Sequence, residues 1–167
     1  MDQPVGAAYL REVSRLLRQY KQLADRAMSQ AGPDAVFRPL DPESNSIATL
    51  MKHMGANMRS RWTDFLTTDG EKPDRNRDAE FELEAGATLD RLRSDWEDGW
   101  RRLFTALEAL GPDDLLRTVT IRGEPLTVLQ AIERATAHYA YHVGQIVFLA
   151  KHLQGGAWQT LSVPRRR

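Results

Sequence analysis

The sequence of 167 residues contains no cysteine. This absence excludes a disulfide scaffold, a thiol nucleophile, an iron–sulfur cluster and a thiolate zinc site. Any metal site must therefore be built from histidine, aspartate or glutamate side chains. The chain has only four histidines, and their placement becomes the central question: His53, His138, His142 and His152.

The sequence also lacks an excess of charge of either sign. Lys and Arg number 23, Asp and Glu number 23, and the formal net charge is zero. This balance argues against a protein that binds nucleic acid through bulk positive charge. The three arginines at 165–167 are too few to change that conclusion.

Long hydrophobic runs are missing as well. The longest apolar segment, Val143 to Ala150, is interrupted by Gly144 and Gln145, whereas a membrane span needs roughly 18 apolar residues. The N-terminal region carries charges throughout and does not look like a signal peptide. We therefore expect a cytoplasmic protein with no membrane segment.

What is present fits one globular domain over residues 1–167. Hydrophobic residues make up 41% of the chain, and a chain of this length can bury a hydrophobic core without needing disulfide bonds to stabilise it. The sequence has no Gly-rich phosphate loop, no Gly-x-Ser-x-Gly elbow and no His-Glu-x-x-His motif.

Four segments have the three- and four-residue apolar spacing of amphipathic helices. Their expected bounds are about Val5–Gln30, from Ser44 or Ser46 to Thr67–Gly70, Ala79–Leu110, and from a Thr127 cap to about Leu153. Such a pattern predicts an all-α four-helix bundle. The β-branched run Thr118–Ile121, a turn at Gly123 and the following Leu126 predict a short hairpin or extended detour before the last helix.

The segment Glu71 to Asp78 is rich in charge. We interpret it as a solvated loop, with a lid over a pocket as the alternative. Helix formation is not expected there.

Three of the four histidines fall where a bundle can gather them. His138 and His142 are four residues apart, so one helix presents both on one side, on the flank of its apolar face. His53 lies beside the apolar stripe of the second helix. Three imidazoles would leave a coordination position open, as in catalytic zinc sites, although nickel, iron or manganese also suit imidazole. The alternative is a set of ordinary partly buried histidines, and His152 is interpreted as a surface residue.

Three polar residues near these histidines are candidates for substrate binding. Asn57 and Arg61 continue the line of His53 along the second helix, and Arg61 can hold an anionic group by a bidentate contact. The alternative for Arg61 is an ion pair with a third-helix acid such as Glu97. Gln145 can donate to a bound ligand or simply lie at the surface.

These segments together resemble the DinB/YfiT-like superfamily of metal-binding four-helix bundles, in an uncharacterised bacterial branch. The resemblance rests on Ile47–Met54, Ser60–Pro73 and, most specifically, the run from His138 to Ile146. It implies an up-down-down-up bundle, frequently homodimeric, with a divalent metal, zinc or nickel, bound by His53, His138 and His142. Relatives of this branch are expected to have a histidine at Leu126, and its absence here argues against proton transfer by the hairpin.

The resemblance leaves two functional hypotheses. Some superfamily members are thiol-dependent transferases or isomerases, so one hypothesis is a metal-dependent thiol transferase or hydrolase acting on a small molecule, with a low-molecular-weight thiol as a candidate partner. The other is a non-enzymatic metal-binding module for stress response or scaffolding. Fold alone does not decide between them.

Overall fold

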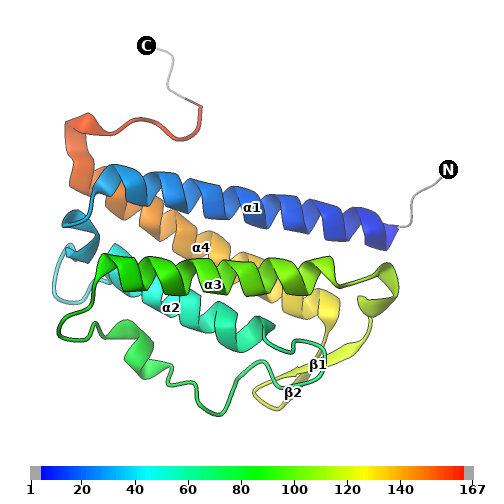
Figure 1. Ribbon diagram of the computed structural model, residues 1–167. Helices are drawn as coiled ribbons and strands as arrows, with labels where there is room; N and C mark the ends of the chain where they lie inside the picture. Colours follow the sequence, from blue (N-terminus) through cyan, green and yellow to red (C-terminus); the bar gives the residue numbers. More distant parts are fainter. Residues whose placement is uncertain (1–4, 164–167) are drawn as a thin grey trace.

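The computed structural model describes residues 5–163 and confirms the four-helix architecture (Figure 1). The long helices are α1 (Val5–Ala31), α2 (Ile47–Trp62), α3 (Leu89–Glu108) and α4 (Val128–Gln154). Short 3-10 turns lie at Ala35–Phe37, Asp78–Phe81, Pro112–Asp114 and Gly155–Ala157. Within the described part of the chain, no helix is long and apolar enough to cross a bilayer.

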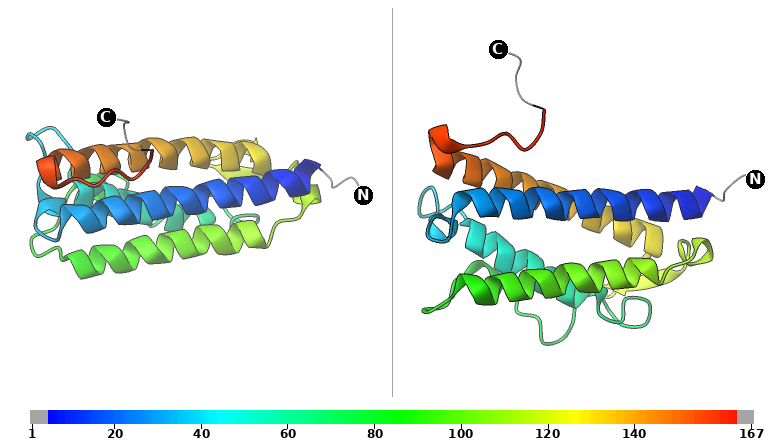
Figure 2. Two further views of the ribbon diagram at one scale, coloured as in Figure 1. Left: turned by 90° about the horizontal axis from the view of Figure 1, so that it is seen from above. Right: turned by 45° about the horizontal axis from the view of Figure 1, so that its top comes forward.

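The helices are arranged up-down-down-up. Helices α1 and α4 run in one direction and α2 and α3 in the other (Figure 1), and the views in Figure 2 show α1 beside α4 as well as beside α3. Because α2 and α3 are parallel neighbours, the chain must return along the bundle between them. Residues 63–88 make this return, which we call the crossover.

The predicted hairpin is confirmed. Strands β1 (Thr118–Ile121) and β2 (Glu124–Thr127) pair antiparallel, with Val119 opposite Leu126. Gly123, with φ of 74°, supplies a left-handed residue at the turn. The Thr127 hydroxyl then accepts from the Gln130 amide and begins α4 as the sequence predicts.

Two helix bounds differ from the prediction. Helix α2 ends at Trp62 and not near Gly70, because Asp64 takes a left-handed conformation (φ of 48°) and its carbonyl accepts from the amides of Thr67 and Thr68. Helix α3 begins at Leu89, after a Thr88 cap, and not at Ala79.

The core lies between the helices and is rich in aromatic and methionine side chains. Trp96, Trp100 and Tyr139 are among its largest fully buried members. Helices α2 and α3 approach closely where Gly55 meets Gly99, since a Cβ on Gly99 would lie 3.1 Å from the Gly55 Cα. This crossing places α2, and with it His53, firmly against the core.

Candidate metal centre

Three histidines from two helices meet in the interior. The Nε2 atom of His138 lies 3.1 Å from Nε2 of His53 and 3.1 Å from Nε2 of His142. His53 is only 2% exposed and His142 only 6% exposed. The predicted gathering of the α2 histidine with the α4 pair is therefore observed.

The outer ring nitrogens of two histidines are held by hydrogen bonds. His53 Nδ1 lies 2.8 Å from Glu80 Oε2, and His142 Nδ1 lies 2.8 Å from Gln145 Oε1. Carboxylate and amide oxygens accept, so both imidazoles donate from Nδ1. In their neutral forms, both then direct an Nε2 lone pair to the shared centre, as metal-binding histidines do.

The donor set fits a divalent metal ion. His138 has at most one Nε2 proton and can donate it to only one neighbour, so at most one of the two contacts at 3.1 Å is a hydrogen bond, and a bound cation would account for both. Bonds of 2.0–2.1 Å at tetrahedral angles place imidazole nitrogens about 3.3 Å apart, close to the observed spacing. One donor atom from each histidine lies within 4.8 Å of the other two. This buried cluster could hold a metal ion.

Electrostatics keep His138 and His142 unprotonated. Burial lowers the pKa of His138 to about 3, helped by the neighbouring histidines and by Arg61 and Arg75. Burial also lowers the pKa of His142 to about 4, against the hydrogen bond to Gln145. Neutral imidazole is the form that binds metal.

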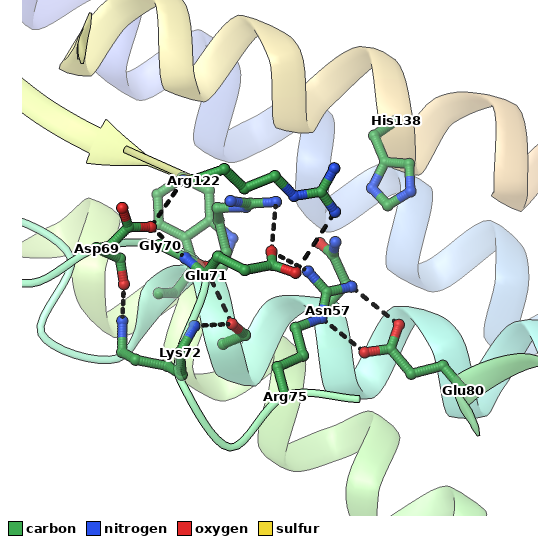
Figure 3. Close-up of polar contacts among 12 residues, drawn as sticks. Asn57, Asp69, Gly70, Glu71, Lys72, Arg75, Glu80, Arg122 and His138 are labelled. Carbon is green, nitrogen blue, oxygen red and sulfur yellow. Dashed lines mark hydrogen bonds and ion pairs between the residues drawn. The ribbon is translucent and has the colours of Figure 1, made fainter. Parts of the chain in front are cut away.

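The crossover supplies a charged network behind His53. The Arg75 guanidinium donates to both carboxylate oxygens of Glu80 at 2.6 and 2.9 Å and to Glu71 at 2.7 Å, and Figure 3 shows Arg75 between these two acids. Although burial opposes ionisation, the hydrogen bonds from Arg75 and His53 hold the pKa of Glu80 below its ordinary value. Glu80 is thus an ionised acceptor that fixes the His53 ring.

Phe81 completes the wall on this side. Its ring stacks on the His53 ring with centroids 4.4 Å apart. Phe81 was predicted to lie in the third helix, which is wrong, because it belongs to a 3-10 turn that precedes α3. The prediction of a solvated loop over Glu71–Asp78 holds for most of its residues but is wrong for Arg75, whose side chain is only 3% exposed and ties the segment to the site.

A cleft of about 430 Å³ opens beside the histidines. All three histidines line it, together with residues from α2, the crossover, the hairpin and α4. A cleft at this place gives a small molecule access to the centre.

The chain matches the family model described as a protein of unknown function, DUF1572, over residues 4–167. It belongs to the DUF1572 family. No curated protein and no solved structure matches the chain significantly. Membership of DUF1572 therefore assigns no reaction, and the site itself must carry the functional argument.

The three residues predicted for substrate binding differ in their contacts in this DUF1572 chain. Asn57 lines the cleft but also accepts a hydrogen bond from the buried Tyr139 hydroxyl at 3.1 Å. Gln145 contacts His142 and does not line the cleft. Gln145 thus orients the His142 ring, a role that was not predicted from the sequence.

Arg61 lines the cleft and is 8% exposed. Its nearest acid is Glu71 of the crossover, 3.7 Å away, and not Glu97, which pairs with Lys21 on α1. The alternative ion pair with the third helix is therefore wrong.

Two further expectations concern residues outside the centre. His152 is exposed near the end of α4, as predicted. Leu126 is half-buried in the hairpin and does not line the cleft.

Glu80 is the residue of the centre that sequence reasoning missed. It lies 27 residues after His53, at the start of the segment that the sequence analysis assigned to the third helix. Chemistry offered a signal that could have found it. A metal-binding histidine ordinarily needs an acceptor for its second nitrogen, and the acidic residues of the crossover were candidates for that acceptor.

Proposed function

We propose that this chain is a divalent-metal-dependent enzyme in which His53, His138 and His142 hold the metal. The observation that carries the proposal is the convergence of three Nε2 atoms, two of them oriented from behind by Glu80 and Gln145. Zinc or nickel is the proposed metal, since imidazole suits both. Bound there, such an ion supplies a Lewis acid that activates water or a thiol.

The rest of the site supports an enzyme over a closed structural centre. Among residues 5–163, the three histidines form a metal-type cluster with no fourth histidine or carboxylate in it. The cluster also borders a cleft. Three protein ligands beside open space are typical of catalytic sites, whereas structural zinc sites are closed by four.

The protein side chains have separate tasks in this proposal. Glu80 and Gln145 hold two rings in one tautomer, Phe81 excludes water from one face of His53, and Asn57 and Arg61 face the substrate. By the resemblance to the DinB/YfiT-like bundles, the reaction is transfer to or from a small thiol, with hydrolysis of a small molecule second. The homodimer implied by that resemblance stays a prediction.

Metal analysis of the full chain, purified without a histidine tag, tests the proposal. We expect one equivalent of metal, lost in His142→Ala and retained in His152→Ala, because His152 is exposed on the same helix. Substoichiometric metal that is equal in all three proteins would refute metal binding.

Cobalt substitution separates an open centre from a closed one. We expect the visible spectrum of the Co²⁺-loaded protein to change when a small thiol is added, because the thiolate can enter the open position. A spectrum that no added thiol or anion perturbs would favour the non-enzymatic module instead.

A further inference from the structure

The cleft has two chemically different ends. On α2, His53 is followed two turns later by Arg61, and on α4, His138 and His142 are preceded by Arg134. Each four-residue step advances about 6 Å along a helix. Because α2 and α4 run in opposite directions (Figure 1), the three histidines meet at one end and the two arginines at the other.

Arg61 is a buried cation with unused hydrogen-bonding capacity. Its Nη1 atom is buried and has no hydrogen-bond partner, and Nη2 is 3.7 Å from Glu71 Oε2, beyond hydrogen-bond reach. The absence of a side chain on Gly70 permits this position, since a Cβ there would lie 3.1 Å from Arg61 Nη1. An unpaired buried donor is costly, and a bound anion would satisfy it.

Arg134 adds a second unpaired cation. It is exposed, and within residues 5–163 it makes no hydrogen bond or ion pair. It lies close enough to Arg61 that, after burial, it contributes to lowering the pKa of Arg61. Two guanidinium groups from facing helices repel each other unless an anion lies between them.

The lining as a whole is positive. Five arginines and no described aspartate or glutamate line the cleft: Arg61, Arg75, Arg77, Arg122 and Arg134. The acids that contact these arginines are not among the lining residues, and Glu71 is shared, contacting Arg61, Arg75 and Arg122. Figure 3 shows Arg122 reaching over Glu71 from the hairpin. The cleft therefore keeps an excess of positive charge.

We propose that Arg61 and Arg134 form an anion subsite that binds a carboxylate or phosphate group of the substrate. A guanidinium matches both groups with paired hydrogen bonds. The part of this inference that places the reacting group at the histidine end rests on the proposed function. The anion subsite itself needs only the two arginines.

Calorimetric titration of the full chain with inorganic phosphate and with succinate, at constant ionic strength, tests the subsite. The protein is first stripped with EDTA so that a metal cannot bind the anions. We expect saturable binding that Arg134→Gln weakens about tenfold, the loss of one charge-assisted hydrogen bond of about 1.4 kcal/mol. The preferred anion distinguishes phosphate from carboxylate substrates.

Arg93→Gln is the matched control, because Arg93 is exposed on α3, away from the cleft. Arg61→Lys is the second variant, which keeps the charge but loses the paired geometry, and we expect it to weaken binding as well. Absence of binding of either anion, or equal weakening by Arg93→Gln and Arg134→Gln, would overturn the subsite. Arg134-dependent binding in a protein that fails the metal analysis would retain the subsite and refute only the proposed function.

Discussion

The contact between Gly55 on α2 and Gly99 on α3 sets how closely the two parallel helices approach. A Cβ on Gly55 would lie 2.9 Å from the Asp95 carbonyl oxygen and 3.1 Å from its carbon. These are backbone atoms of a helix and cannot swing aside as a side chain would. Gly55→Ala must therefore push α3 away from α2.

Two opposing effects set the change in folding stability of Gly55→Ala. Alanine is favoured over glycine inside a helix by about 1 kcal/mol. Overpacking costs about 1–3 kcal/mol, and a backbone obstacle places this site at the upper end. We expect Gly55→Ala to destabilise the fold by about 2 kcal/mol net.

Gly144→Ala on α4 is the matched control. Nothing lies within 4 Å of a Cβ at Gly144, so only the propensity term applies there. We expect this variant to be up to about 1 kcal/mol more stable than wild type. The two variants should therefore differ by about 3 kcal/mol and in opposite directions from wild type.

Urea unfolding measures both variants, with an unchanged slope indicating that the unfolded states are comparable. Equal stability of Gly55→Ala and Gly144→Ala would contradict the close contact between α2 and α3. It would also mean that His53, two residues from Gly55, is positioned by something other than this crossing.

The remaining predictions concern the centre. Glu80→Gln should weaken zinc binding about 10- to 100-fold in competition titrations, because the acceptor behind His53 loses its charge, whereas Glu84→Gln, with its side chain 85% exposed on the same crossover, should not. The metal-free protein should lose stability as the pH falls from about 6.5 to 4, because the unfolded chain takes up protons on His138 and His142 that the folded chain does not. Each of these histidines should lower the free energy of unfolding by up to about 1.4 kcal/mol per pH unit. Chemical denaturation at several pH values in this range measures the free energy of unfolding. We expect this free energy to fall less steeply with falling pH in His142→Gln, and the same pH dependence as in wild type would contradict the burial of this histidine.

Much of the fold was predictable because it follows local rules. Helical periodicity located all four helices, and Thr127 was identified as a cap from its chemistry and position. The histidine cluster was also accessible, since the spacing of His138 and His142 fixes their common side once the segment is helical. The pairing with His53 required only that the two flanking faces meet in a bundle.

The crossover was not predictable in the same way. Its charged residues look solvated in sequence, yet Arg75 and Glu80 neutralise each other through two hydrogen bonds and bury together. The two residues are only five apart in sequence, but their burial depends on the crossover packing against His53 of α2, which no local pattern records. Phe81 was misassigned for the same reason, because it packs on His53 from outside any long helix.

The zero net charge of the chain conceals how unevenly that charge is distributed. Arginines from α2, α4, the hairpin and the crossover line one cleft, while the acids that contact them are not part of its lining. These arginines affect both ends of the cleft. Arg61 and Arg75 help to lower the pKa of His138, and the positive cleft surface attracts anions. A composition average can thus exclude a large nucleic-acid surface and still be compatible with a small, positively charged site beside three histidines.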